Sequence, residues 1–336
     1  KVGGHIYGGY NTFGLGRNTS FQNMDMAVNL DVEKQINKRV GVGFQLQTSP
    51  GNGFHQFPGP GASLTDAYMT FQYNPNLLFL MGSFDTPFGQ EVPALTNNAN
   101  TFSNHFIYNS LLYAALAGPM GTLNTIGASS TVTLPNGEVT LAVTNGTSED
   151  SGNTNATFEG VVRGVVQAHE TTTVGLSFLS DAGKDSGGFQ ADLSGVMADA
   201  KVQLNRYVSI TTYFAQMTYN DQNGSTKDKV HAGMIEISQD FGGVRLSGRV
   251  SSWTPEDSDA DGTGISSAIQ DPGMRHILQG TTGEVLDEGL LRYQIALSMD
   301  VDPAVRLKGE VFIDDYQSSP GLYNAVGLLI GTNVAF

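Results

Sequence analysis

Apolar and polar residues alternate with a period of two along most of the chain, a pattern that predicts β-strands rather than helices. In Met24–Val32 the even positions are apolar, as at Met26 and Val28, and the odd positions are mostly polar, as at Asp25. The same alternation runs through residues 290–302, and no stretch has the periodicity of an amphipathic helix. We therefore expect an all-β fold.

The connections between these stretches alternate in length. Short turns such as Asn37-Lys38 and Asp302-Pro303 alternate with long connections such as 49–65, 85–120 and 254–288. Short turns at one end and long loops at the other are typical of an outer-membrane barrel. We count about sixteen strands, at 3–14, 23–35, 39–48, 66–74, 77–84, 121–134, 138–145, 156–169, 172–180, 188–204, 207–219, 229–241, 244–253, 290–302, 305–315 and 321–336.

The predicted fold is a single domain over residues 1–336, a transmembrane antiparallel β-barrel with short periplasmic turns and long extracellular loops. A tilted strand crosses a membrane in about 9–11 residues, which the predicted strands can supply. Closure of the barrel pairs every strand edge, as the bilayer requires. An even strand number puts both termini at the end with the short turns.

Composition fits a barrel that faces lipid outside and water inside. Charged residues make up 15% of the chain, compared with roughly 25% in soluble domains. The net charge of −15 argues against a nucleic-acid partner, because phosphates need cationic side chains. The chain has no cysteine, which excludes disulfides and cysteine-bound metals.

Both ends of the sequence suggest an exported protein. The chain begins at Lys1 without a signal peptide, so we expect a mature, processed chain in the bacterial outer membrane. It ends at Phe336, preceded by apolar residues at alternate positions, as at Val334 and Ile330. A terminal aromatic in this setting resembles the recognition signal of outer-membrane barrels. An ordinary edge strand is the simpler alternative.

Residues 80–91, with the sequence LMGSFDTPFGQE, resemble a strand-end motif of bacterial porins. The motif has the form G-x-F-x-x-P-F-G-x-E and is similar to that of the phosphate-selective porins O and P and of OmpL-like β-barrel porins. The likeness extends over about residues 77–150. It implies a sixteen-stranded passive diffusion channel that assembles as a trimer. Residues 85–120 contain no Lys or Arg, however, so we do not expect phosphate selectivity.

The connection 85–120 is a candidate constriction loop. A loop of this length in a compact fold is usually functional, and in general porins such a loop narrows the lumen. It carries Asp85, Glu91 and His105 together with several aromatic residues, which predicts a weakly acidic, partly apolar constriction. A lid or an extracellular contact loop is the alternative.

Strand phase predicts which charged residues line the pore. A basic stripe is expected on three successive strands, and a transverse field would form between it and acidic groups, as in other selective pores. The simpler alternative is ion pairing that stiffens the wall. The basic candidates are Arg245, Arg249, Arg292, Arg306 and Lys308, joined by Arg163; the acidic candidates are Asp25, Asp31, Glu33, Glu310 and Asp314.

The long acidic connection 254–288 contains a partial calcium motif. Asp257, Asp259 and Asp261, followed by Gly262, match the start of a calcium loop, but its twelfth position is Ala268 instead of Glu. A hydrated acidic surface loop is the stronger interpretation, and a calcium site is the alternative. We expect no other cofactor.

The main functional hypothesis is a porin for passive diffusion of small hydrophilic solutes and ions. Its partners would be outer-membrane lipid and further copies of the chain, as a trimer, without nucleic acid. The first alternative is a barrel that anchors a surface or envelope partner. A secreted β-solenoid is disfavoured because no repeat is visible. An enzyme is not expected, since no catalytic constellation is visible in the sequence.

Overall fold

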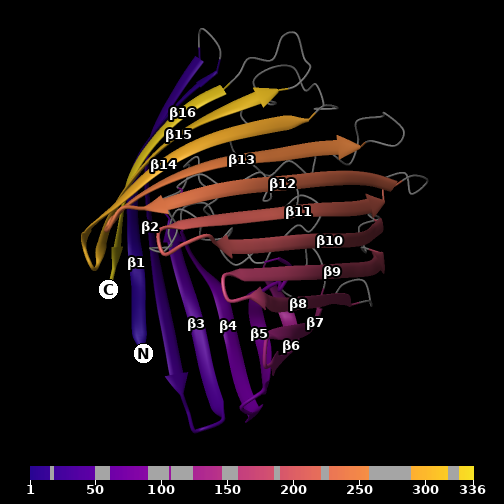
Figure 1. The fold of residues 1–336 in the computed structure, drawn as a ribbon. Coiled ribbons are helices and arrows are strands. Elements are labelled where there is room, and N and C mark those ends of the chain that lie inside the picture. The colour runs from indigo at the N-terminus through magenta and orange to yellow at the C-terminus, as the bar shows by residue number, and fades with distance from the viewer. Residues whose placement is uncertain are drawn as a thin grey trace.

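A computed structural model describes residues 1–15, 19–49, 61–89, 106, 124–145, 158–184, 190–220, 227–256, 289–316 and 325–336. Strands from these ranges form a closed antiparallel barrel in which each strand pairs with the next and β1 pairs with β16 (Figure 1). The described residues include no helix that is long and apolar enough to cross a membrane. The strands are β1 (Val2–Leu15), β2 (Thr19–Gln35), β3 (Val40–Ser49), β4 (Gly61–Asn74), β5 (Leu77–Asp85), β6 (Asn124–Leu134), β7 (Gly137–Thr144), β8 (Glu159–His169), β9 (Thr172–Lys184), β10 (Gln190–Gln203), β11 (Val208–Asn220), β12 (Lys227–Asp240), β13 (Val244–Glu256), β14 (Leu290–Asp302), β15 (Val305–Tyr316) and β16 (Ala325–Ala335).

The predicted barrel and its sixteen strands are confirmed. The strand ends differ from the predicted ones by a few residues. For example, β4 begins at Gly61 instead of 66, because residues up to Ser49 of β3 continue to pair with it. Strand ends are harder to predict than strand centres, because the period-two pattern weakens where both faces become polar.

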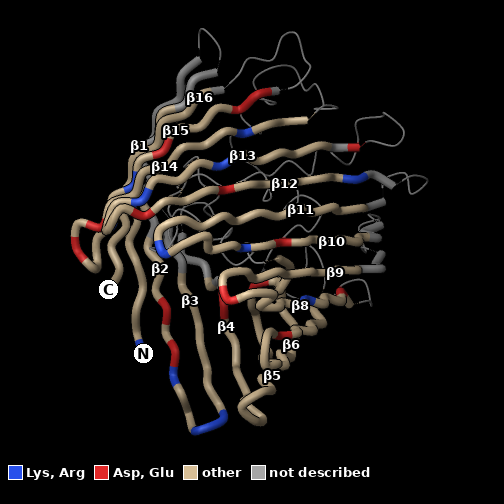
Figure 2. The backbone as a smooth tube through the Cα atoms, viewed as in Figure 1, with Lys and Arg blue, Asp and Glu red and all other residues tan. Residues whose placement is uncertain are grey.

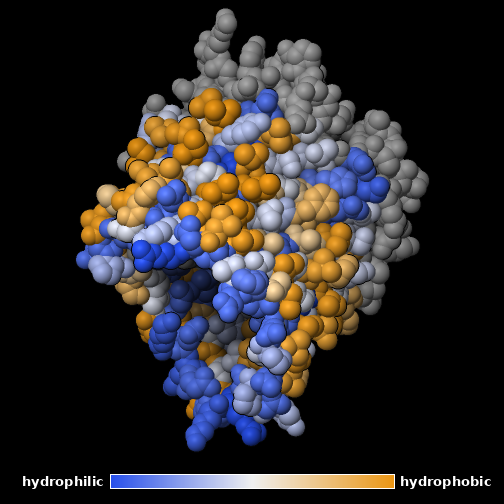
Figure 3. Space-filling view, in the orientation of Figure 1, coloured by the Kyte–Doolittle hydropathy of each residue, from blue (hydrophilic) through white to orange (hydrophobic). Residues whose placement is uncertain are grey.

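Side-chain alternation separates an apolar outer face from an inner face on which charged and polar residues lie among apolar ones such as Met197 and Trp253. Met26, Phe79 and Ile295 point outward and are 52%, 41% and 63% exposed, whereas Arg292 and Asp314 point inward and are fully buried. Hydrophobic residues gather on the outer wall, and hydrophilic residues surround a hollow near the chain ends (Figure 3). This is the reverse of a soluble protein, which turns its apolar faces inward.

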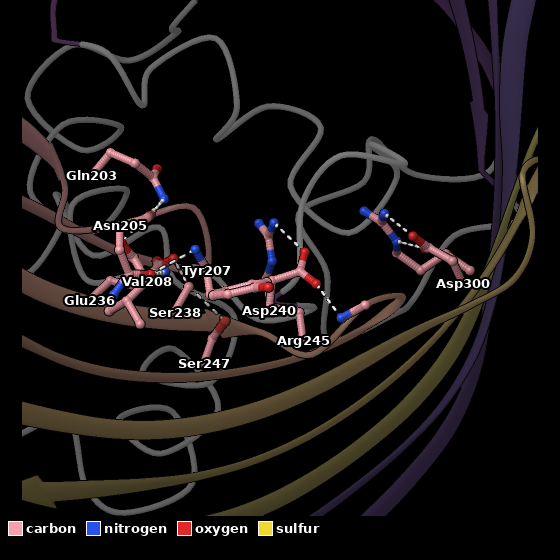
Figure 4. Close-up of polar contacts among 12 residues, drawn as sticks. Gln203, Asn205, Tyr207, Val208, Glu236, Ser238, Asp240, Arg245, Ser247 and Asp300 are labelled. Carbon is pink, nitrogen blue, oxygen red and sulfur yellow. Dashed lines mark hydrogen bonds and ion pairs between the residues drawn. The ribbon is translucent and has the colours of Figure 1, made fainter. Parts of the chain in front are cut away.

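A repeated side-chain contact closes several of the short turns. Gln203 Nε2 donates to the carbonyl oxygen of Asn205 at 2.6 Å, and Asn205 Oδ1 accepts the backbone N–H of Val208 at 3.0 Å (Figure 4). Asn side chains favour such turns because they satisfy backbone donors two or three residues ahead. The same Gln contact to the residue two positions later occurs at Gln35, Gln72 and Gln167.

The seam between β1 and β16 closes the barrel with a continuous ladder. Ile6 pairs with Val334, and the backbone N–H of Phe336 donates to Gly4 O at 3.0 Å. Both termini therefore lie at the end of the barrel with the short turns, which we call the turn end. The opposite end, where the long connections leave the strands, is called the loop end.

Candidate pore interior

The residues of the predicted basic stripe all lie on the inner face. Arg245 and Arg249 come from β13, Arg292 from β14, and Arg306 and Lys308 from β15. They share their strand phase with buried inner residues such as Ser247 and Ser298. Figure 2 shows acidic positions beside these basic positions on neighbouring strands. Strand phase thus identified the inner face, although it does not give the partner of each charge.

Four of these arginines face a carboxylate directly across a strand pair. The registers place Arg249 opposite Glu236, Arg245 opposite Asp240, Arg292 opposite Asp314 and Arg306 opposite Asp300. Side chains directly opposite each other in an antiparallel pair have Cβ atoms about 4.5–5.5 Å apart, within reach of an ion pair. Each register partner is also the ion-pair partner.

The pair between Arg292 and Asp314 is the most deeply buried of the four. Arg292 Nε donates to Asp314 Oδ1 at 2.7 Å and Nη2 donates to Oδ2 at 2.8 Å, and neither side chain is exposed. Such a two-point contact satisfies both carboxylate oxygens and fixes the guanidinium plane. Losing one partner would leave a buried charge without compensation.

The pairs become more exposed toward the turn end. Arg245 Nη2 lies 3.1 Å from Asp240 Oδ2, and Arg306 Nε lies 2.5 Å from Asp300 Oδ1 (Figure 4). Asp240 Oδ1 also accepts the backbone N–H of Gly242 at 2.7 Å, so this carboxylate supports the turn as well as the pair. Lys308 lies deeper on the same face and is 2% exposed.

Arg163 of β8 forms its ion pair with a residue two strands away, on β10, instead of with a residue on an adjacent strand. Its Nη1 and Nη2 donate to Asp199 on β10 at 2.6 and 3.0 Å, and the intervening β9 carries Gly175 at this level. A Cβ atom on Gly175 would lie 2.5 Å from Asp199 Oδ1 and 2.7 Å from Arg163 Nη2. The glycine therefore leaves the space through which the pair forms. The sequence did not indicate Asp199 as the partner.

The predicted acidic residues have different surroundings. Asp31 on β2 accepts a hydrogen bond of 2.7 Å from Gln45 Nε2, and Glu33 has the same strand phase nearer the turn end. Glu310 accepts Gln294 Nε2 at 2.8 Å. The side chain of Asp25 lies outside the described part of the chain. Asp85 is the last residue of β5 and shares the strand phase of the outward-facing Phe79 and Met81.

The segment after β5 enters the barrel. Thr86 and Phe88 are fully buried, and Thr86 shares a hydrogen bond of 3.3 Å with Thr125 of β6. The backbone N–H of Gly89 donates to Ser177 Oγ of β9 at 3.0 Å. Gly89 has a φ of +75°, and a Cβ there would lie 2.3 Å from Met197 Sδ. The Thr-Pro-Phe-Gly part of the porin-like motif is thus packed against the inner wall.

A second contact of the same connection lies on the far wall. Phe106 is fully buried, and the guanidinium carbon of Arg249 lies 3.8 Å from its ring centroid. This geometry is that of a cation–π contact. Because β13 is eight strands from β5 in either direction around the barrel, the connection between β5 and β6 reaches the opposite wall.

Several predicted site residues fall outside the described part of the chain. They are Glu91 and His105 of the candidate constriction and Asp257, Asp259 and Asp261 of the calcium motif. Among the described residues, no group of three or more His, Asp or Glu side chains could hold a metal ion.

Comparison with known proteins gives a match in structure but none in sequence. No family model and no curated protein matches the chain. The anion-selective porin of Comamonas acidovorans matches with a TM-score of 0.70 at 10% identity, covering 100% of this chain and 99% of that one. OprB of Pseudomonas putida matches at 0.68 with 10% identity and DcaP of Acinetobacter baumannii at 0.67 with 13%, each over 100% of this chain and 94% and 96% of theirs. The chain therefore has the fold of bacterial outer-membrane porins.

Proposed function

We propose that the chain is a bacterial outer-membrane porin that lets small hydrophilic solutes and ions diffuse passively. One observation carries this proposal: a closed sixteen-stranded barrel has an apolar outer face and turns its strand arginines and carboxylates, such as Arg292 and Asp314, inward. In a bilayer, closure satisfies every backbone group, and the outer face meets hydrocarbon. A channel function needs no catalytic group, in keeping with a non-enzymatic role.

The outer face supports placement in the membrane. Ile235, Phe214 and Ile295 are each more than half exposed near the middle of their strands. Contiguous apolar surface of this kind is rare on soluble monomers and marks contact with lipid or protein. We propose the outer membrane as the location, with the turn end in the periplasm.

The connection between β5 and β6 is the proposed constriction. Its described residues contact two separate parts of the inner wall, through Gly89 at β9 and Phe106 at β13. Because these two contacts lie on different walls of the barrel, we propose that the connection narrows the lumen between them.

The charge of the lumen favours cations. Among the described residues on the inner faces of β1–β8, five are carboxylates and one, Arg163, is basic. Arg163 is paired with Asp199, and the arginines of the basic stripe are paired on their own wall. A net acidic wall concentrates cations in a pore. The carboxylates on β1–β8 are Asp31, Glu33, Asp66, Glu138 and Glu159.

The finer family relationship is also a proposal. Thr86, Phe88 and Gly89, which belong to the porin-like motif, are the residues that hold the segment inside the barrel. A motif whose role is to hold this segment against the inner wall does not depend on the solute. OmpL-like and phosphate-selective porins with different solutes could therefore share it. We propose kinship with that group without phosphate selectivity, and a trimeric assembly that chemical cross-linking in detergent would test.

A barrel that anchors a partner without transport is the second candidate. It is favoured by the complete burial of the inner side chains Trp253, Arg292 and Asp314, since an open lumen would expose them to water. The anchor and the porin make opposite predictions for current across a membrane.

Planar-bilayer recording of the refolded protein tests the proposal. A porin gives steady conductance steps, and a reversal potential under a salt gradient with the sign of cation preference. Insertion without conductance would contradict the porin and favour the anchor. An anion-preferring potential would leave the porin in place and contradict the assigned selectivity.

A further inference from the structure

The inner face of β10 holds Phe88 and Gly89, from the connection after β5, at close range. Phe88 is fully buried, and a Cβ atom placed on Gly195 of β10 would lie 3.1 Å from Phe88 Cζ. A Cβ atom placed on Gly89 would lie 2.3 Å from Met197 Sδ, two positions further along the same strand face. Glycine on both sides of the contact therefore lets the backbone of the connection lie directly on the wall.

Ser177 supplies the polar contact at this place. It lies opposite Met197 in the β9–β10 register and is fully buried. The backbone N–H of Gly89 donates to Ser177 Oγ at 3.0 Å, and Arg163 Nη1 donates to the same oxygen at 2.8 Å. A hydroxyl oxygen has two lone pairs that can accept hydrogen bonds. Both are used here, so the contact with Arg163 fixes the orientation of the hydroxyl that Gly89 meets.

Asp199 in turn fixes Arg163. Nη1 and Nη2 of the arginine lie 2.6 and 3.0 Å from the two carboxylate oxygens, and the two side chains are 11% and 3% exposed. A planar guanidinium held at two points keeps one orientation, and the same Nη1 also reaches Ser177, which lies opposite Arg163 in the β8–β9 register. A continuous series of buried contacts thus runs from Asp199 through Arg163 and Ser177 to Gly89.

The same contacts reduce the effect of Arg163 on a passing ion. Its positive charge is matched by the negative charge of Asp199 at ion-pair distance, and the pair is almost completely buried. The field of such a pair falls off faster with distance than the field of a single charge. The main effect of Arg163 is therefore on the groups that it touches.

We propose that Ser177 and Arg163 are positioning residues for the connection between β5 and β6. They hold Gly89 on the inner wall and thereby set the size of the opening. This inference rests on the proposed constriction, and it assigns Arg163 to the support of the connection instead of to ion selection.

The chain has no cysteine, so the labelling of one introduced thiol tests this proposal directly. Met197→Cys places the thiol beneath Gly89, at a position that is fully buried. The rate of its reaction with a water-soluble maleimide is measured by mass spectrometry on the full-length protein refolded in detergent. Adding Ser177→Ala should raise this rate about two- to tenfold, the usual effect of one hydrogen bond on an equilibrium. An unchanged rate would overturn the proposal.

Two controls separate local release of the segment from general loosening of the barrel. Ser247→Ala removes another buried hydroxyl, which shares a hydrogen bond of 2.7 Å with Ser238, and it should leave the labelling of Met197→Cys unchanged. Ala296→Cys, buried on β14, should be labelled at the same rate with and without Ser177→Ala. An equal acceleration in either control would show general loosening and would count against the proposal.

Arg163→Lys tests the role of the guanidinium group. Lysine keeps the positive charge but presents one nitrogen in place of a planar fork, so it does not hold both oxygens of Asp199 and Ser177 in the same way. We expect faster labelling of Met197→Cys, in the range of the Ser177→Ala effect. A rate equal to that of the protein with arginine at this position would overturn the role assigned to Arg163.

Current recording distinguishes the failure of this inference from the failure of the proposed function. Ser177→Ala should raise the single-channel conductance and leave the reversal potential unchanged, because the substitution removes no charge. Faster labelling with unaltered conductance would keep the anchoring of Gly89 and overturn the constriction. Open channels in which Ser177→Ala changes neither labelling nor conductance would overturn the anchoring and leave the porin standing.

Discussion

Phe106 and Arg249 meet across the barrel, with the guanidinium carbon 3.8 Å from the ring centroid. The phenylalanine belongs to the connection after β5, and the arginine belongs to β13 on the opposite wall. This contact joins the proposed constriction to the basic stripe. The same guanidinium also pairs with Glu236, with Nη2 2.9 Å from Oε2, so one arginine contacts both the connection and the neighbouring strand.

Phe106→Ala should loosen the connection and enlarge the channel. A cation–π contact contributes about 0.5–2 kcal/mol, depending on its desolvation, and its loss would favour conformations in which the connection has left β13. We expect larger and noisier single-channel steps. Phe178→Ala, at an outward position that is 50% exposed, serves as the control and should leave the conductance unchanged. Equal conductance in all three proteins would mean that Phe106 does not restrict the lumen.

Replacing either member of the Arg292–Asp314 pair should destabilise the barrel more than replacing both. A single change leaves a buried charge without its partner, which costs about 3–5 kcal/mol. The double variant Arg292→Met with Asp314→Leu removes both charges and should recover much of the loss. The midpoint of denaturant unfolding in vesicles measures the difference. Additive losses in the double variant would contradict a coupled pair.

Gly175→Ala should disturb the Arg163–Asp199 pair. The added methyl would lie 2.5 Å from Asp199 Oδ1, so the pair must shift. Overpacking of this kind costs about 1–3 kcal/mol. Because Arg163 Nη1 also donates to Ser177 Oγ at 2.8 Å, the anchoring of Gly89 should weaken too. Gly164→Ala, where no atom lies within 4 Å of the new Cβ, is the matched control and should be nearly neutral in unfolding experiments.

Removing carboxylates from β2 should reduce the cation preference. The double variant Asp31→Asn with Glu33→Gln keeps the side-chain size and removes two negative charges from the inner face. The reversal potential should move toward zero, most strongly at low salt, where screening is weakest. Glu256→Gln, on the exposed outer side and paired with Lys229, changes charge without changing the lumen and should leave the potential unaltered. A similar shift in both would mean that the lumen does not set the selectivity.

Asn205→Ala should destabilise the turn between β10 and β11. Its Oδ1 accepts backbone N–H groups of Tyr207 and Val208 at 2.8 and 3.0 Å. Each hydrogen bond contributes about 1 kcal/mol net, and less where water replaces it. Arg206→Ala in the same turn removes an exposed contact with the Tyr207 ring and is the control. Equal unfolding midpoints for the two variants would show that the Asn contacts add little.

The alternation of side chains determined the strands, their number and their inner face, because a strand between lipid and water must repeat every two residues. Arg249, Arg292 and Lys308 were therefore identified as inner residues from phase alone. The turn contacts of Gln203 and its counterparts recur in the sequence as Gln two positions before Asn or His, a signal of these turns that lies outside the period-two alternation.

The partners of those residues required the tertiary structure. Glu236 and Asp314 meet their arginines because the registers of β12–β13 and β14–β15 bring them opposite, and a register shift of one residue would separate them. The path of Phe106 to β13, and of Gly89 to Ser177, depends on closure of the whole barrel, which brings together residues far apart along the chain. Local alternation determines which face a side chain takes, whereas long-range pairing decides which charge it meets.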